Sequence, residues 1–538
     1  MMLASCFLAV LAVLAGAVED PDIGYSLLFE TAPEEFSRQC VDVSPQSKPF
    51  PTWASGDFII PSIGVVSMGD RTMVGLLDPF GKMQRFEMKG STVCAAYRIM
   101  ATGFYNASKA LNTVAPSLLF YETDPPRDCP MYNPMCNMMP HAPNDNCFVN
   151  TFKVGSKMLS ITDAPSMLEI DPRTLQVLKK HQFDADRMEE TLPYAGSAHP
   201  VNHPVTGDWI DFVGNANLLT GGAQVNFFHL SGDNPTFRHS LGNLTFDHPP
   251  YMHSFGVTEH YLVLPRMPVE LNILDILYRP LSAAFKDLKM SAPGIDNAFV
   301  LLPLDGSGKV IRAYLPLNDM LYYVHTVNAY ENATDIVIDL TTSSHNPFAS
   351  HALTLPSNKD KAMRDTFSPE VVKRFVIPLQ EGNPVAASVI SDPRTSTDFT
   401  KINPRFAGKK HCFFWAVENK HDGESYASIA IVKYDLCYGS PAKHWFRQSW
   451  YPSEATMIPS PEPSAAEDDG LLVFTALDGA ADQSYLVTLD AQTMEIRSEA
   501  GPFPRVGFTT HGQFYKAGSW AQTDSAEFAG QEVDSLMV

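Results

Sequence analysis

Four histidines of this 538-residue chain stand in sequence contexts that suit metal binding. Strand-like residues lie beside three of them, and the intervals between them are long, at 54, 72 and 186 residues. The four contexts are Ser197-Ala-His199-Pro200, Tyr251-Met-His253-Ser-Phe255, Val324-His325-Thr-Val-Asn328 and Gly507-Phe508-Thr-Thr-His511. Four neutral imidazoles without a carboxylate ligand would favour Fe(II) and leave positions open for O₂ and water. A single histidine is more often a core or surface residue, but the four contexts together predict one metal centre.

Motifs for other common chemistries are missing from the sequence. It contains no His-Glu-x-x-His, paired Cys-x-x-Cys, Gly-x-Ser-x-Gly, Walker or dinucleotide-binding pattern. A glycosidase would need paired carboxylates that the sequence does not locate, and it would leave the four histidine contexts without a role. Histidines without comparable flanks are expected to be structural: His203, His260, His345 and His411.

Short strand-like runs separated by turn residues dominate the chain, so the fold is expected to be all-β. Residues 168–177 and 487–496 match in type at nearly every position, with alternating apolar residues on both sides of an Asp-x-x-Thr turn. Looser copies end at Asp305 and Asp435. Scattered hairpins of one kind favour a β-propeller, in which each blade presents its inner strand to the axis, over an array of sandwiches. No long linker divides the chain, which predicts one domain over residues 18–538.

Net charge excludes some partners. The formal charge is −21, and so acidic a chain would be repelled by phosphate backbones and by anionic lipid surfaces. We therefore expect neither nucleic acid binding nor a polybasic membrane anchor.

The N-terminus is expected to direct secretion. Residues 1–18 carry no charged side chain, and Ala15-Gly16-Ala17 fits a cleavage site, which predicts a signal peptide over residues 1–17. An uncleaved membrane anchor and the first half of a plastid-targeting signal are the alternatives. Acceptor patterns for N-glycosylation at Asn106, Asn243 and Asn332 agree with secretion.

The mature chain would keep seven cysteines, so at least one is unpaired. Cys129, Cys136 and Cys147 crowd a Pro/Asn/Met-rich stretch over residues 124–146, which predicts a long loop held by a disulfide.

Residues 271–288, from Leu271 to Leu288, are apolar with helical spacing and contain Pro280. Two interpretations remain open. One is an ordinary core helix, and the other is an apolar lip that contacts a membrane or a lipophilic substrate.

The sequence around the four histidines resembles the carotenoid cleavage oxygenases. The resemblance runs from Gly24-Tyr-Ser-Leu-Leu-Phe29 to His511-Gly512 and is most specific in three blocks. These are Met252-His-Ser-Phe-Gly-Val-Thr-Glu-His-Tyr261, His325-Thr-Val-Asn-Ala-Tyr-Glu331 and Glu467-Asp-Asp-Gly470. The resemblance implies a seven-bladed propeller with one axial Fe(II) on the four histidines, under a helical or loop cap. It also implies cleavage of a carotenoid or apocarotenoid double bond by O₂.

The carboxylates that orient the histidines depart from the family pattern. The resemblance implies three glutamates that accept hydrogen bonds from ligating histidines. Glu454 matches one, whereas Asp163 and Asp398 stand where the other two are expected. Each aspartate is one methylene shorter, so it must lie closer to its histidine or act through water.

Aromatic residues near the histidines could line a substrate tunnel or belong to the core: Tyr194, Phe255, Trp415 and Phe508. The sequence thus favours a carotenoid dioxygenase. The alternatives are a non-oxidative isomerase or isomerohydrolase on the same fold, and a secreted lipophile-binding protein with a degenerate site.

Overall fold

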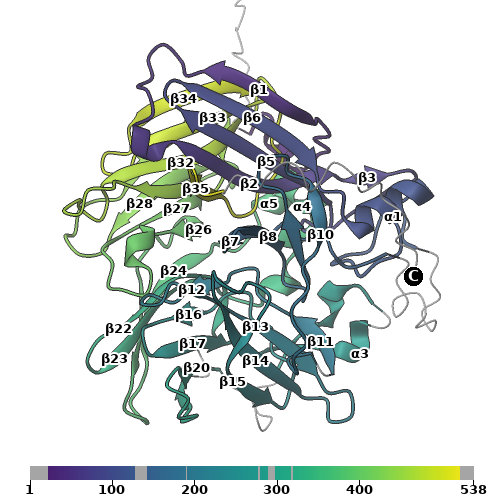
Figure 1. The fold of residues 1–538 in the computed structure, drawn as a ribbon, viewed down its shortest axis with the longest axis vertical. Helices are drawn as coiled ribbons and strands as arrows, with labels where there is room; N and C mark the ends of the chain where they lie inside the picture. Colours follow the sequence, from purple (N-terminus) through teal and green to yellow (C-terminus); the bar gives the residue numbers. More distant parts are fainter. Residues whose placement is uncertain are drawn as a thin grey trace, which may run out of the picture.

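The computed structural model describes residues 22–127, 142–189, 191–276, 279–288, 297–316 and 319–520. Seven antiparallel sheets follow one another round a ring in sequence order, which Figure 1 shows as a colour progression from purple through teal and green to yellow. This confirms the predicted seven-bladed propeller and excludes a sandwich array.

The blades are numbered by sequence order. Blade 1 contains β1 (Phe36–Asp42), β6 (Thr92–Ile99), β5 (Phe80–Lys89), β2 (Gly56–Val65) and β35 (Gln513–Lys516). Blade 2 contains β7 (Asn150–Val154), β8 (Lys157–Ile161), β9 (Met167–Ile170) and β10 (Val177–Lys180). Blade 3 contains β11 (Leu192–Ala195), β12 (Val201–Asn202), β13 (Trp209–Ala216), β14 (Ala223–Leu230) and β15 (His239–Phe246). Blade 4 contains β16 (Gly256–Val257), β17 (Tyr261–Arg266), β20 (Ala298–Pro303) and β21 (Ile311–Tyr314).

The remaining blades complete the ring. Blade 5 contains β22 (Tyr322–Glu331), β23 (Asp335–Ser343), β24 (Val371–Pro378) and β25 (Ala386–Val389). Blade 6 contains β26 (Ser396–Lys401), β27 (Phe413–Asn419), β28 (Ala430–Asp435) and β29 (Lys443–Trp445). Blade 7 contains β30 (Trp450–Pro452), β31 (Thr456–Pro459), β32 (Gly470–Asp478), β33 (Gln483–Asp490) and β34 (Ile496–Phe503).

The C-terminal strand closes the ring. β35 pairs with β2, so the first blade is built from both ends of the chain, and Phe58 lies opposite Phe514. Figure 1 shows the yellow strand beside the purple one.

The predicted Asp-x-x-Thr hairpins join β9 to β10 in blade 2 and β33 to β34 in blade 7. The Asp171 carboxylate accepts the amides of Arg173 and Thr174 between β9 and β10, and Asp490 does the same for the amides of Gln492 and Thr493. An aspartate that binds the backbone two and three residues ahead closes such a turn. Asp305 and Asp435 cap the matching turns of blades 4 and 6.

Apolar side chains between neighbouring blades form the core. Phe212 and Phe227 of blade 3 pack with Leu262 and Val300 of blade 4, for example. Each fully buried side chain of this size contributes about 1.5–3 kcal/mol, so the ring is held mainly by contacts between blades.

A cap of loops and short helices joins blades 1, 4 and 5. Its helices are α1 (Gly103–Leu111), α3 (Ile273–Ile276), α4 (Leu355–Lys359) and α5 (Lys361–Arg364). The amide of Leu76 donates a hydrogen bond to the carbonyl of Leu353, and the amide of Leu281 donates one to the carbonyl of Leu119. These bonds link segments that are far apart in sequence and confirm the expected cap.

The helical interpretation of residues 271–288 was wrong for most of the segment. Among the described residues of this segment, α3 and the 3₁₀ turn η3 (Leu281–Ala284) are helical, and β18 (Val269–Leu271) pairs with β19 (Phe285–Asp287) across them. Pro280 prevents a continuous helix, and the pairing of Leu271 with Phe285 buries both. Leu274 is exposed. Within the described residues no helix has the length and apolar character needed to cross a bilayer.

Two disulfides lie in the described part of the chain, Cys40–Cys94 and Cys412–Cys437. Cys147 is buried and unpaired, and burial raises the pKa of its thiol. Cys129 and Cys136 lie outside the described residues, as do residues 1–17. Asn106, Asn243 and Asn332 are all exposed.

A buried ion pair holds β23 to β24, and its loss should be costly. Arg374 donates two hydrogen bonds of 2.8 Å to Asp339, which is fully buried and also lies 3.3 Å from His411. We expect Arg374→Leu to lower the free energy of unfolding by about 3–5 kcal/mol, because it leaves a buried carboxylate without its guanidinium. Urea unfolding would measure this loss. The control is Arg394→Leu, which removes an exposed pair with Asp392 and should lower the free energy of unfolding far less, because solvent screens the pair. Equal losses in the two variants would contradict the assignment.

Candidate metal centre

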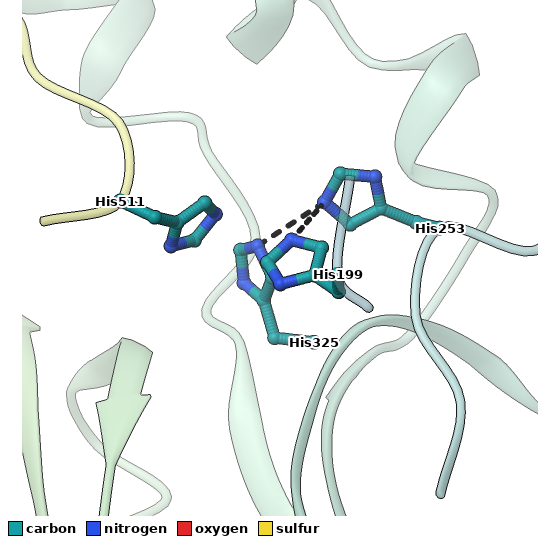
Figure 2. Close-up of side chains that lie close together, drawn as sticks. All are labelled: His199, His253, His325 and His511. Carbon is teal, nitrogen blue, oxygen red and sulfur yellow. Dashed lines mark hydrogen bonds between the residues drawn. The ribbon is translucent and has the colours of Figure 1, made fainter. Parts of the chain in front are cut away.

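The four predicted histidines converge at the centre of the ring (Figure 2). His199 lies between β11 and β12, His253 precedes β16, and His325 lies in β22. The pairing of β22 with β23 is irregular around His325. Such an irregularity can redirect a side chain that would otherwise follow the alternating pattern of the strand. His511 stands two residues before β35. Blades 3, 4, 5 and 1 thus supply one histidine each.

The spacing of the ring nitrogens fits one metal ion. The Nε2 atom of His253 lies 3.0 Å from that of His199 and 3.3 Å from that of His325. One nitrogen from each of the four rings lies within 4.8 Å of the others. Metal–nitrogen bonds of about 2.1 Å at right angles separate two ligands by about 3.0 Å, and opposite ligands by about 4.2 Å. The distances of 3.0 and 3.3 Å fall in this range.

Three carboxylates contact the outward nitrogens of three of the rings. Asp163 lies 2.8 Å from Nδ1 of His253, and Asp398 lies 2.7 Å from Nδ1 of His325. Glu454 lies 2.9 Å from Nδ1 of His511. Both aspartates therefore reach their histidines directly, without the bridging water that was the alternative. Asp163 comes from blade 2, Asp398 from blade 6 and Glu454 from blade 7, so every blade contributes to the site.

These contacts leave the inward nitrogens without protons. A neutral imidazole has one N–H, and a carboxylate can only accept it, so Nδ1 of His253 and of His325 each donate outward. Both Nε2 atoms then present lone pairs to each other at 3.3 Å. Two facing lone pairs repel unless a cation lies between them. The donor set therefore fits a resident metal ion such as iron.

The electrostatics of the site support neutral rings at His199 and His511. Burial, together with the other three histidines, holds the pKa of His199 well below its usual range. Burial also lowers the pKa of His511 to about 4. Burial opposes charge on His325 as well, but the adjacent Asp398 carboxylate raises its pKa. Contacts with His253 and with the hydroxyl of Tyr251 overcome the effect of burial on Asp163 and lower its pKa.

Residues from two of the three specific sequence blocks, Asn328 and Glu467, link neighbouring blades. The Asn328 side chain donates to the carbonyls of Phe406 and Lys409 and accepts the amide of Gly408. Glu467 accepts the amides of Cys412 and Phe413 at the start of β27. These residues act as ties between blades 5, 6 and 7 and do not touch the metal site. His411 is buried beside Asp339, as expected of a structural histidine.

The four predicted tunnel residues differ in their surroundings. Phe255 and Trp415 have no accessible surface, so neither borders a cavity that could admit a substrate, and we assign both to the core. Tyr194 is partly buried and donates its hydroxyl to the carbonyl of Pro250. Phe508 is partly buried and packs against Phe399 with the ring centres 6.2 Å apart.

Sequence reasoning missed Phe399, which lies beside two of the histidines. Its ring centre is 5.5 Å from those of His325 and His511. It follows Asp398 and has a positive φ of 50°, an unusual conformation for a phenylalanine. Its place directly after an orienting carboxylate was the signal that could have identified it.

Asp211 was also missed. It borders a cavity of about 440 Å³ between blades 2 and 3, together with Ser197, Gly196 and His181. Burial raises the pKa of Asp211 to about 8, and the charge of Asp163 adds to this effect. Asp211 is therefore a second buried acidic residue whose pKa responds to the carboxylate that orients His253.

Comparisons with known proteins agree with this geometry. The sequence model of the family described as retinal pigment epithelial membrane protein matches residues 29–516. The chain is 24% identical over 451 residues to a carotenoid isomerooxygenase of Galleria mellonella, covering 80% of this chain and 84% of the relative. It is 22% identical over 512 residues to a β,β-carotene 15,15′-dioxygenase of Rattus norvegicus, covering 87% and 88%.

Solved structures share the fold. An apocarotenoid oxygenase from Synechocystis superposes with a TM-score of 0.76 at 19% identity, covering 92% of this chain and 99% of the other. A cobalt-substituted form of that protein gives the same values. Because the family model spans nearly the whole chain and the fold agrees, this protein belongs to the retinal pigment epithelial membrane protein and carotenoid oxygenase family.

Proposed function

We propose that the protein is an Fe(II)-dependent dioxygenase that cleaves a double bond of a carotenoid or apocarotenoid with O₂. The observation that carries the proposal is the set of inward Nε2 lone pairs, fixed by carboxylates on the opposite side of three rings. Fe(II) bound there supplies redox chemistry with O₂. His199, His253, His325 and His511 would hold one iron per chain.

The protein side chains hold the histidine rings in one orientation and shield one side of the site with apolar groups. Asp163, Asp398 and Glu454 fix the tautomers, which keeps the ligating nitrogens unprotonated. Phe399 presents its aromatic ring beside His325 and His511, and Phe508 packs against Phe399. An aromatic surface of this kind suits a lipophilic polyene and disfavours polar substrates.

Cleavage of a carotenoid panel under air and under argon tests the proposal. We expect the iron-loaded protein to convert at least one carotenoid or apocarotenoid into two carbonyl products under air, and to give none under argon. Mass spectrometry with ¹⁸O₂ should place label from O₂ in the products, because dioxygenase chemistry incorporates both oxygen atoms. Turnover under argon, or isomeric products without label, would favour the non-oxidative isomerase or isomerohydrolase. Binding of carotenoids without iron and without turnover would favour a lipophile-binding protein.

We also infer entry into the secretory pathway. The two disulfides fit an oxidising compartment, and the three glycosylation patterns lie on exposed asparagines. Peptide mapping of the protein purified from its source would detect glycans on Asn106, Asn243 or Asn332. A chain that keeps residues 1–17 and carries no glycan would contradict this inference.

A further inference from the structure

A second group of metal-ligating side chains lies on blade 6, apart from the four histidines: Glu418, His421 and His444. Glu418 is in β27 and His444 is in β29, with β28 between them. Ala416, Val432 and His444 lie opposite one another across the three strands. Glu418 is two residues beyond Ala416 and therefore shares its face of the sheet. The partner of Glu418 on β28 is Ala430, whose small side chain leaves room for the carboxylate and the imidazole to meet.

The donor atoms are close enough to share one ion. Nδ1 of His421 lies 3.0 Å from Oε1 of Glu418, and Nε2 of His444 lies 3.2 Å from the same oxygen. The centres of the two imidazole rings are 4.6 Å apart. A tetrahedral zinc ion with bonds of about 2.0 Å separates its ligands by about 3.3 Å. The observed contacts are close to that edge length.

The carboxylate is fixed in position before any ion binds. Glu418 is 2% exposed, and its second oxygen accepts the hydroxyl of Tyr434 at 2.9 Å and of Thr395 at 3.1 Å. Hydrogen bonds of this kind orient ligating carboxylates in known metal sites. A divalent cation would also neutralise a negative charge that is otherwise buried.

The two histidines can change tautomer to accept an ion. Without a cation, each ring donates an N–H to Glu418. To ligate, each ring must carry its proton on the other nitrogen, Nε2 of His421 or Nδ1 of His444. The side chains of both rings are partly exposed, at 24% and 29%, so water can deliver and remove these protons.

We propose that Glu418, His421 and His444 form a second metal site that binds a zinc-type divalent cation. Two imidazoles and one carboxylate are a ligand set that Zn²⁺ prefers, and a water molecule would complete the tetrahedron. His421 lies in the turn after β27 and His444 lies in β29, so the ion would tie the outer strand of blade 6 to that turn. The site is independent of the iron that we propose for the ring centre.

Zinc titration of the iron-loaded protein tests the proposal. We expect equilibrium dialysis against micromolar Zn²⁺, followed by elemental analysis, to find about one zinc per chain without loss of iron. The double variant His421→Ala/His444→Ala should bind this zinc at least about 100-fold more weakly. The matched control is His229→Ala/His239→Ala, which removes another stacked histidine pair, on blade 3, and should keep the wild-type affinity.

Stability measurements separate ligation from folding defects. Zn²⁺ should raise the melting temperature of the wild type and of the control, and should not raise that of His421→Ala/His444→Ala. Glu418→Gln, which keeps the shape of the side chain, should also lose the zinc-dependent shift. Zinc uptake that is unchanged in the double variant, uptake that displaces iron, or no uptake in the wild type would each overturn the proposal.

Discussion

Replacing His253 with alanine is expected to remove bound iron and oxidative cleavage together. Nε2 of His253 lies within 3.3 Å of the Nε2 atoms of both His199 and His325, so it belongs to the closely spaced ligand set. Its loss removes a ligand and also leaves Asp163 without its imidazole partner. We expect iron content to fall from about one per chain to below about 0.1, and cleavage to fall at least about 1000-fold. Elemental analysis and product formation under air measure the two quantities.

A matched substitution shows whether the effect belongs to the site. His345 is exposed, and its ring contacts the hydroxyl of Ser344, so His345→Ala should keep both iron and activity. Circular dichroism and melting curves of both variants would show whether the propeller still folds. Full iron content and activity in His253→Ala would contradict the metal assignment. Iron loss with unchanged cleavage would contradict the proposed function alone.

Substitution of Asp398 is expected to give the second largest effect. The Asp398→Asn variant can still accept the proton of His325 Nδ1 through its amide oxygen, but it loses the negative charge that raises the pKa of His325. We expect turnover or iron affinity to fall about 10–100-fold, as is typical when a residue that orients a metal ligand changes. The rate of cleavage at saturating Fe(II) and the iron concentration needed for half activation separate the two contributions.

The Asp398→Glu variant tests whether the shorter side chain is a defect. Asp398 already lies 2.7 Å from His325, and its negative charge adds to the effect of burial in raising the pKa of Glu370, so a second carboxyl group lies near it. The extra methylene of a glutamate would have to displace either the His325 ring or the Glu370 carboxyl group. We therefore expect Asp398→Glu to lower activity as well, by about 10-fold. Higher activity than the wild type would show that the site is built for glutamate at this position.

Local patterns in the sequence predicted the parts of the fold that depend on short segments. Asp171 and Asp490 predicted hairpins, because an aspartate carboxylate can accept a hydrogen bond from the amide two residues ahead and so close a turn. The four histidines could be grouped because their flanking residues resemble one family, not because of their spacing. The pattern of residues 271–288 wrongly predicted one helix, because apolar residues in short strands and turns can imitate helical spacing.

Contacts across blades could not be predicted from the sequence. Phe255 and Trp415 stand near ligands or family motifs in sequence, yet their side chains point into the core between blades. Asp211 lies in β13 of blade 3 and Phe399 lies in β26 of blade 6, and both come near the site only when the blades are assembled. Glu418 and His444 are 26 residues apart in sequence and meet only after β28 pairs with both β27 and β29.

The pairing of β35 with β2 makes the metal centre depend on the closure of the ring. His511 reaches the other three histidines only when the C-terminal strand has joined the first blade. During synthesis His511 therefore becomes available after the other three ligands, and the complete site cannot form on a partial chain that lacks it. An ion bound by all four histidines would in turn hold the two ends of the chain together. Because binding and closure are thermodynamically linked, each strengthens the other by the same factor.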